Sequence, residues 1–373
     1  MMKIGYDAKR IVRNGTGLGN YGRTLVNDIA QYDRQLDLRL YAPDKGRDKL
    51  RGQIVAQDNV SFCYPHDSAL PFAKAWWRTK GMVKDLQRDQ IQIYHGLSGE
   101  LPFGISKTNI RSVVTIHDLI FLRHPEFYHW IDTKIYTWKF LQTIKEADHI
   151  IAISECTKRD IMAFGEVDGS QISVIYQSCA PRFSGKWKEE SGKRKEICGR
   201  YILSVGSIEE RTNILLAVKA LPLLPKDLQL VIVGRHTKYT DVVQDYVQRH
   251  GLTQRVKILH GVKDEELPDL YAGAEAFVYP SLYEGFGIPI IEAISTGLPV
   301  VACTGSCLEE AGGPDNLYVA PDDAEGMAAA IRQVLRGAEG REERILRSQA
   351  YIRRFEGQNV AQQVVDLYHQ LIY

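Results

Sequence analysis

The 373-residue chain lacks several features, and each absence excludes a class of protein. No uninterrupted apolar stretch reaches the roughly 18–20 residues of a membrane-spanning helix, and the first residues contain no apolar signal-peptide core. The six cysteines include no Cys-x2-Cys pair and no zinc-binding spacing with histidine. A formal net charge of only +1 argues against a general nucleic-acid binder. These absences favour a cytoplasmic protein with reduced thiols, no zinc and no nucleic-acid partner.

The sequence that is present has the composition of an ordinary globular protein, with 44% hydrophobic and 25% charged residues, and its length allows two domains. Short apolar runs alternate with longer helical patterns, which predicts an α/β fold with parallel sheets covered by helices. The predicted strands are 2–6, 36–41, 91–95, 111–116, 149–153, 201–205, 228–233, 256–259, 276–278 and 299–302. The predicted helices are 20–32, 132–146, 214–221, 238–250, 264–272 and 358–371.

A polar and charged stretch at 181–196 has no apolar periodicity and precedes a predicted strand. It predicts a boundary between a first domain, 1–180, and a second domain, 200–357. An amphipathic helix ends the chain.

The most informative segment contains two glutamates eight residues apart, Glu284 and Glu292. An apolar run that is typical of a buried strand precedes them, and a helix begins near residue 290. Gly285 and Gly287, between the glutamates, permit close approach of the backbone to a ligand, and a helix N-terminus favours a pyrophosphate. Carboxylates accept hydrogen bonds from sugar hydroxyls. The alternative is a strand–loop–helix unit with two solvated glutamates.

This segment resembles the Glu-x7-Glu signature of the retaining GT-B glycosyltransferases of family 4, group 1, which includes bacterial mannosyl- and glucosyltransferases. Three further motifs resemble that family: the glycine loop with Gly17 and Gly19, the strand end at His117-Asp118, and the loop that begins at Gly206. The four motifs follow the family's order over nearly the whole chain.

The resemblance implies a GT-B fold, in which two Rossmann-like domains face each other across a cleft. The first domain would lie on the acceptor side, with helix 358–373 crossing back onto it, and the second would bind the donor. The implied activity is transfer of a hexose, with retention, from a nucleotide-diphosphate sugar to a glycan or lipid-linked acceptor. GDP-mannose is the first expectation for the donor, UDP-glucose and related donors come next, and no cofactor is expected.

The resemblance also assigns roles to residues. Glu284 would contact the transferred sugar, Glu292 the ribose, and the amides around Gly285, Phe286 and Gly287 the pyrophosphate. His117 would lie near the donor sugar, where a histidine at the carboxyl end of a parallel strand faces a ligand crevice. A hydrogen-bonded structural histidine is the alternative.

The chain departs from the family at the Gly206 loop, where basic residues are common. Ser207 and Thr212 occupy those two positions, so Arg211 is the remaining cation of the loop. Its guanidinium fits a diphosphate, although a solvated loop arginine is also consistent with the sequence. The predicted catalytic residues are His117, Glu284 and Arg211. The predicted donor-binding residues are Gly17, Gly19, Gly206, Thr212, Arg235, Lys238, Gly285, Phe286, Gly287 and Glu292.

No Asp-x-Asp sequence occurs in the chain. Glycosyltransferases of the other major fold use that spacing to hold a divalent metal on the diphosphate. We therefore expect no metal site, with amides and basic side chains neutralising the leaving group.

Residues 71–88 combine tryptophans with lysines and arginines. This pattern suits peripheral contact with an anionic membrane surface at its inner face or with a lipid-linked acceptor. It is also typical of a helix that faces the core and has a solvated basic edge.

Two other functions are consistent with parts of the sequence. The Gly17-x-Gly19 motif after a strand suggests an NAD-linked oxidoreductase, but that function leaves Glu284 and Glu292 unexplained. The neutral residues Ser207 and Thr212 suggest a nucleotide-sugar-binding protein with weak or no turnover.

Overall fold

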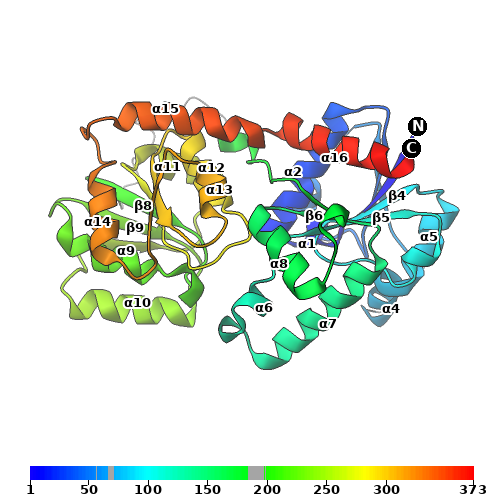
Figure 1. Cartoon of the computed structure of the whole chain (residues 1–373), viewed down its shortest axis with the longest axis horizontal. Helices are drawn as coiled ribbons and strands as arrows, with labels where there is room; N and C mark the ends of the chain where they lie inside the picture. Colours follow the sequence, from blue (N-terminus) through cyan, green and yellow to red (C-terminus); the bar gives the residue numbers. More distant parts are fainter. Residues whose placement is uncertain (56, 66–70, 184–196, 198) are drawn as a thin grey trace. The chain divides into compact units, whose positions relative to one another are not determined.

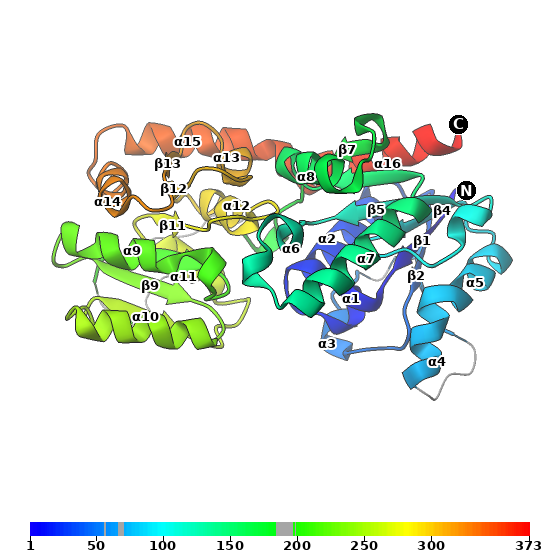
Figure 2. The ribbon, with the colours of Figure 1, turned by 60° about the horizontal axis from the view of Figure 1, so that its bottom comes forward.

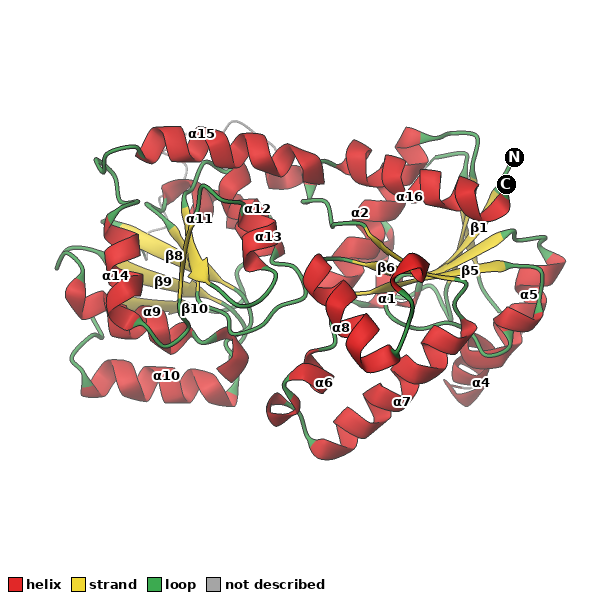
Figure 3. Cartoon of the chain, in the orientation of Figure 1, coloured by secondary structure: helices red, strands yellow, loops and turns green. Residues whose placement is uncertain are grey.

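A computed structural model describes residues 1–55, 57–65, 71–183, 197 and 199–373. The chain forms two compact units, coloured along the sequence in Figure 1. Unit 1 comprises Met1–Ser178 and Phe355–Tyr373, and unit 2 comprises Cys179–Arg354. In each unit a sheet lies between helices, as Figure 3 shows by element type. None of the helices in the described ranges is both long and apolar enough to cross a membrane.

Unit 1 contains a seven-stranded parallel sheet in the order β3-β2-β1-β4-β5-β6-β7. Its strands are β1 (Lys3–Asp7), β2 (Asp37–Tyr41), β3 (Val60–Cys63), β4 (Ile93–Gly96), β5 (Arg111–Ile116), β6 (His149–Ala152) and β7 (Ile172–Val174). Its α-helices are α1 (Lys9–Arg13), α2 (Gly17–Tyr32), α3 (Asp48–Arg51), α4 (Pro71–Trp76), α5 (Met82–Arg88), α6 (Ile120–Arg123), α7 (Trp130–Glu146), α8 (Glu155–Gly165) and α16 (Gly357–Ile372).

Unit 2 contains a six-stranded parallel sheet in the order β10-β9-β8-β11-β12-β13. Its strands are β8 (Tyr201–Val205), β9 (Gln229–Val233), β10 (Val256–Leu259), β11 (Phe277–Tyr279), β12 (Val300–Cys303) and β13 (Leu317–Val319). Its α-helices are α9 (Ile214–Ala220), α10 (Lys238–Arg249), α11 (Leu267–Gly273), α12 (Ile288–Ser295), α13 (Leu308–Gly312), α14 (Ala324–Arg332) and α15 (Arg341–Ile352). Figure 2 shows α9 and α10 side by side along the sheet.

The strand order reverses at one point in each sheet. In unit 1, β1 lies between β2 and β4, and in unit 2, β8 lies between β9 and β11. In open parallel sheets, ligands bind at the carboxyl ends of the strands beside such a reversal. We therefore expect ligands to bind near the residues that follow β1 and β4 in unit 1, and near those that follow β8 and β11 in unit 2.

The predicted parallel α/β fold is confirmed, and each predicted strand is present with ends shifted by at most a few residues. One local expectation was wrong. The Gly17-Leu-Gly19 segment was predicted as a loop before a helix that begins at residue 20, but it forms the first turn of α2. A Cβ on Gly19 would lie 1.9 Å from the Asn14 carbonyl oxygen. Gly19 therefore permits the helix to begin directly against the preceding turn.

The core of unit 1 includes the end of the chain. Helix α16 packs against α2, and its side chains Val360, Val364 and Tyr368 are buried in the same cluster as Ile4. The Tyr368 hydroxyl lies 2.7 Å from His95 Nδ1. Residues separated by more than 270 positions thus share one hydrogen bond in the middle of unit 1.

Candidate active site

Glu284 lies in the loop that joins β11 to α12 in unit 2. Its Oε1 accepts hydrogen bonds from the Tyr279 hydroxyl at 3.1 Å and the Ser281 hydroxyl at 3.0 Å. Arg211 Nη1 donates to the same oxygen at 2.7 Å. The side chain of Glu284 is 13% exposed. Three donors therefore hold the Glu284 carboxylate beyond the carboxyl end of β11, beside the strand-order reversal.

Arg211 is held by two carboxylates. Besides its bond to Glu284, its Nε lies 3.3 Å from Glu209 Oε2. Burial alone would lower the pKa of Arg211, but the charge of Glu284 raises it above its ordinary value. The structure thus places a permanent positive charge next to Glu284.

The Gly206 loop follows β8 and forms a small hollow with Ser207, Thr212 and Tyr279. Thr212 is buried, and its hydroxyl is used within its own turn. It donates to the Glu209 carbonyl at 2.7 Å and accepts from the Glu209 amide at 3.2 Å. A donor-binding role for Thr212 would require its hydroxyl to exchange these bonds for a ligand.

Arg235 and Lys238 lie at the start of α10, and both are exposed. Neither forms an ion pair with a residue in the described ranges. They are therefore available to an anionic ligand.

Glu292 belongs to α12 and is only 8% exposed. Its Oε2 accepts a hydrogen bond from the Tyr271 hydroxyl at 3.0 Å. Burial raises the pKa of Glu292 to about 7, and the charge of Arg182 opposes that rise. Glu284 and Glu292 thus have different surroundings. Glu284 is paired with a cation, whereas Glu292 is buried and accepts a hydrogen bond from a tyrosine hydroxyl.

The turn between the two glutamates is fixed at both ends. Cys307 Sγ lies 3.0 Å from the carbonyl oxygens of both Glu284 and Phe286, which share its single S–H hydrogen. Gly287 caps α12 with a φ of +114°, a left-handed conformation that favours glycine. Gly285, Phe286 and Gly287 are all buried. The segment is held close to one conformation, which suits precise placement of backbone groups toward a ligand.

His117 follows β5 in unit 1, and both of its ring nitrogens have partners. Nε2 lies 2.9 Å from the Leu97 carbonyl oxygen, and Nδ1 lies 2.9 Å from the Gln177 amide nitrogen. A carbonyl only accepts, so the ring hydrogen is on Nε2, and Nδ1 accepts from Gln177. Burial lowers the pKa of His117 to about 4. The ring is therefore neutral at pH 7, and donating to a sugar would require it to release Leu97.

A hollow of about 250 Å³ lies beside His117. Its lining includes Leu18, from the glycine motif at the start of α2, and Arg10. Gly17 has open space around it, whereas Gly19 is needed for packing. The glycine motif thus reaches the hollow through Leu18.

Residues 71–88 form α4, a π-helical turn at Trp77–Gly81, and α5. Trp77 is buried, and its Nε1 donates to Asp85 at 2.6 Å, whereas Trp76 is 53% exposed. Met82 and Leu86 pack in the same core cluster as Trp77. The core-facing interpretation of this segment is therefore confirmed for the side that carries Trp77.

Two family models match the chain: "Glycosyltransferase Family 4" over residues 15–178 and "Glycosyl transferases group 1" over residues 185–351. O-antigen chain mannosyltransferase RfbU of Salmonella typhimurium is 32% identical over 363 residues, which are 95% of this chain and 96% of that protein. The chain belongs to the family 4, group 1 glycosyltransferases. This glycosyltransferase is also 29% identical over 388 residues to O-antigen chain mannosyltransferase B of Escherichia coli, covering 99% of this chain and all of that protein.

A solved structure supports the GT-B fold of the glycosyltransferase. Sucrose-phosphate synthase from Thermosynechococcus elongatus matches all of this chain and 99% of that one, with a TM-score of 0.80 and 19% sequence identity. Family membership decides against an NAD-linked oxidoreductase, since the whole chain is accounted for as a hexosyltransferase. Among the described residues, no three His, Cys, Asp or Glu side chains form a group that could hold a metal ion.

Three side chains that shape the site of the glycosyltransferase were not predicted from the sequence: Tyr279, Ser281 and Cys307. Ser281 stands only three residues before Glu284, so its hydroxyl could have been included from spacing alone. Tyr279 ends a strand whose carboxyl end was already assigned to the site. Cys307 carries no such signal, because its contact with the loop depends on the packing of α13 against α12.

Proposed function

We propose that this glycosyltransferase transfers mannose from GDP-mannose to a glycan or lipid-linked saccharide, with retention of the anomeric configuration. The observation that carries the proposal is the Glu284–Arg211 pair at the sheet edge of unit 2, which offers an acceptor for sugar hydroxyls next to a fixed cation. The names of the two O-antigen mannosyltransferase relatives support mannose as the sugar. We further propose that unit 2 binds the donor and unit 1 the acceptor.

In the proposed reaction, the acceptor hydroxyl forms a bond to the anomeric carbon on the face from which the diphosphate departs. A diphosphate oxygen takes the hydroxyl proton as the old glycosidic bond breaks. Arg211 would stabilise the charge that grows on the leaving group, and Arg235 and Lys238 are the further candidates for that role. Glu284 would orient the sugar through its hydroxyls, and Glu292 would accept from the ribose.

A thermal-shift panel of GDP, UDP, ADP and their sugars tests the donor. A ligand at 100 times its Kd stabilises the protein by about 2.7 kcal/mol, so the correct base should give a clear rise in melting temperature. We expect GDP and GDP-mannose to give the largest shift. A larger shift with UDP or UDP-glucose would contradict the assignment of the base. The anomeric configuration of the product, read by NMR, tests retention.

We also propose that transfer needs no divalent metal. Turnover should persist in EDTA, because the guanidinium of Arg211 and backbone amides would neutralise the diphosphate. Loss of turnover in EDTA, with recovery on addition of magnesium or manganese, would overturn this part of the proposal.

A peripheral membrane contact through residues 71–88 completes the proposal, since a lipid-linked acceptor would lie at a membrane. Trp76 and Lys80 are exposed on this segment and support it. Co-sedimentation with vesicles containing anionic lipid should fall in Trp76→Ser. Equal co-sedimentation of the variant and the wild-type protein would remove this segment from the proposal.

A further inference from the structure

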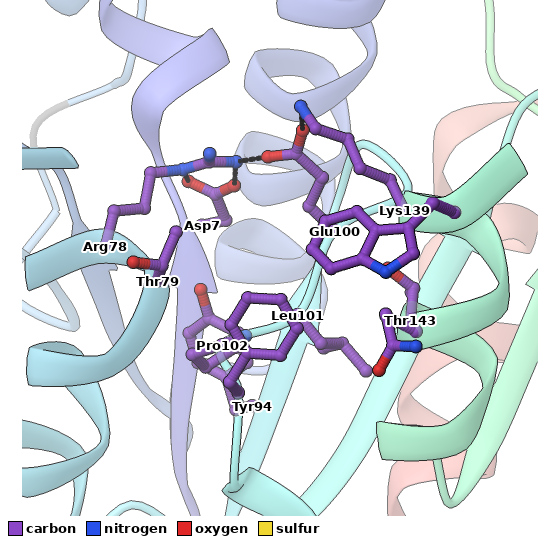
Figure 4. A pocket seen from close by; sticks show the side chains of 12 residues that line it. Asp7, Arg78, Thr79, Tyr94, Glu100, Leu101, Pro102, Lys139 and Thr143 are labelled. Atoms are coloured by element: carbon purple, nitrogen blue, oxygen red, sulfur yellow. Dashed lines mark hydrogen bonds and ion pairs between the residues drawn. The ribbon is translucent and has the colours of Figure 1, made fainter. Parts of the chain in front are cut away.

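A second hollow in unit 1, of about 220 Å³, is not explained by any donor residue (Figure 4). It lies where Asp7 ends β1 and where Glu100 follows β4, which is the strand-order reversal of this sheet. Ligand pockets for drug-sized molecules measure roughly 300–1,000 Å³. The hollow is therefore suited to a smaller ligand, of the size of a single sugar ring.

One side of the hollow is a chain of alternating charges, drawn with dashed lines in Figure 4. Arg78 Nη2 lies 2.7 Å from Asp7 Oδ2, and the same guanidinium pairs with Glu100. Lys139 Nζ lies 3.3 Å from Glu100 Oε1. Burial alone would raise the pKa of Glu100, but the charges of Arg78 and Lys139 lower it to about 2. Glu100 is thus ionised at pH 7, and the chain pairs two acidic side chains with two basic ones.

A balanced set of this kind discriminates between ligands. An anion such as a phosphate would meet Asp7 and Glu100 as well as the two cations, so it would gain little from the site. A neutral ligand with several hydroxyls would gain more, because each hydroxyl can donate to a carboxylate or accept from Arg78 or Lys139.

The lining also includes the aromatic residues Tyr94, Phe103 and Trp138. The ring centroids of Phe103 and Trp138 are 6.0 Å apart. Trp138 is 53% exposed, whereas Tyr94 is buried. The negative face of an aromatic ring attracts the partly positive C–H groups of a sugar. A half-exposed tryptophan beside paired charges therefore provides both surfaces that a pyranose presents, one apolar and one rich in hydroxyls.

Glu100 and Lys139 line this hollow and also the hollow beside His117. The two spaces are therefore neighbours within unit 1, separated by this ion pair. A saccharide in the hollow beside Arg78 would extend toward His117, which the family resemblance places near the transferred sugar.

We propose that the hollow lined by Asp7, Arg78, Glu100, Phe103 and Trp138 binds one neutral hexose unit of the acceptor. This inference rests on the proposed function, and it names the acceptor as a saccharide that is recognised through its own ring. Trp138 would stack on the ring, and the four charged groups would fix its hydroxyls.

The experiment compares Trp138→Ala with Trp130→Ala in the full-length protein. Trp130 is on the same helix, is 62% exposed and lines neither hollow, so it controls for loss of an exposed tryptophan from α7. Transfer from GDP-mannose to mannotriose is measured. We expect Trp138→Ala to raise the KM for the acceptor about tenfold. Trp138→Phe should have an acceptor KM close to that of the wild-type protein, and Trp130→Ala should leave the acceptor KM unchanged. The donor KM should not move in any variant.

An acceptor KM that is equal in Trp138→Ala and Trp130→Ala would overturn the inference, as would a change confined to the donor KM. Inorganic phosphate is the second probe: inhibition competitive with mannotriose would mean that the hollow selects an anion, and would also overturn it. The melting temperature of Trp138→Ala should equal that of the wild-type protein, because the side chain is half exposed. If it does not, Gln142→Ala, another change in the lining, replaces it under the same criteria.

A binding measurement separates this inference from the proposed function. Mannotriose is titrated in the absence of any donor, with tryptophan fluorescence as the readout. A saturable change that Trp138→Phe removes supports the hollow even if GDP-mannose proves to be the wrong donor. No saturable change in a protein that does transfer from GDP-mannose would overturn the hollow and leave the proposed function standing.

Discussion

Both units have polar residues near the carboxyl ends of the strands of their parallel sheets, but the surroundings of these residues differ. In unit 1, His117 is neutral, and protein groups occupy both of its ring nitrogens. In unit 2, the Glu292 carboxylate is buried with a single hydroxyl donor, and burial raises its pKa. His117 in unit 1 is thus hydrogen-bonded without a ligand, whereas Glu292 in unit 2 is a buried group whose charged form burial disfavours. We therefore expect a bound ligand to affect the stability of unit 2 more than the stability of unit 1.

The largest effect expected is on turnover, through Glu284→Gln. The change keeps the shape of the side chain and removes the charge that would orient sugar hydroxyls beside Arg211. Losing one preorganised electrostatic contact typically costs about 10²–10³ in kcat. The affinity for bare GDP, measured by calorimetry, should stay within about threefold, a change of less than 1 kcal/mol.

Glu209→Gln is the matched control, because Glu209 is the other carboxylate on Arg211. It should lower kcat much less than Glu284→Gln does. Equal losses in the two variants would mean that the carboxylates act only by holding Arg211.

The second effect is on nucleotide affinity, through Glu292→Gln. A hydrogen bond to a charged group contributes about 1.5–3 kcal/mol, so GDP should bind roughly 10- to 100-fold more weakly. Stability should change in the opposite direction. Because the folded pKa of about 7 is above the ordinary 4.5, wild-type stability from this group is fully present below pH 4.5 and lost as pH rises through 7.

Glu292→Gln has no such loss. The free energy of unfolding of Glu292→Gln, relative to that of the wild type, should increase by about 3 kcal/mol from pH 4.5 to pH 8. Denaturation at both pH values, without ligand, measures this gain. A constant difference between the two proteins would show that Glu292 has the same pKa in the folded and the unfolded protein, and would contradict the contrast with unit 1.

The third effect is the acid sensitivity of unit 1. The folded pKa of His117, about 4, is below the ordinary 6.5, so its contribution is present above pH 6.5 and lost as pH falls toward 4. At pH 5 the loss amounts to about 2 kcal/mol. Buried His95, whose pKa burial lowers to about 3, adds a loss of the same sign.

His117→Gln should therefore weaken the pH dependence of unfolding between pH 6.5 and pH 5 by about 2 kcal/mol. Tryptophan fluorescence is a suitable readout, because four of the five tryptophans belong to unit 1. An unchanged pH dependence in this variant would mean that His117 has the same pKa in the folded and the unfolded protein.

The smallest effect is expected from Thr212→Lys. The new ammonium would lie near the departing diphosphate, so it should raise kcat several-fold and tighten donor binding less, since its charge matters most in the transition state. Thr212→Val is the control, because it removes the bonds to Glu209 without adding a charge. If Thr212→Lys does not exceed Thr212→Val in kcat, Arg211, Arg235 and Lys238 already supply the charge that the diphosphate needs.

The sequence predicted the central strands because these strands are buried on both faces and appear as continuous apolar runs. Three strands were not predicted: β3, β7 and β13. Each is three or four residues long, ends its sheet and is only partly buried; the edge strand β10, which was predicted, differs in having three aliphatic side chains among its four residues. The local Glu284 segment was predicted on the same basis as the central strands, from a strand, a glycine turn and a helix in direct succession.

The pairings of charged residues that were not predicted depend on long-range contacts. Arg78 meets Asp7 across 71 positions, and Arg211 meets Glu284 across 73. No spacing rule connects such residues, since the strand order that joins them is a property of the whole sheet. The difference between Trp76 and Trp77 has the same origin: only the packing of the segment decides which one is buried.

The return of α16 to unit 1 has a consequence for synthesis on the ribosome. Unit 2 is one continuous segment, Cys179–Arg354, so its core can close without the residues of α16 that follow it. Unit 1 begins first but cannot complete its core until Tyr368 is released, because that side chain belongs beside Tyr6 and His95. The later-made unit can therefore finish folding before the earlier one. A premature stop codon near residue 355 would leave unit 2 intact and deprive unit 1 of part of its interior.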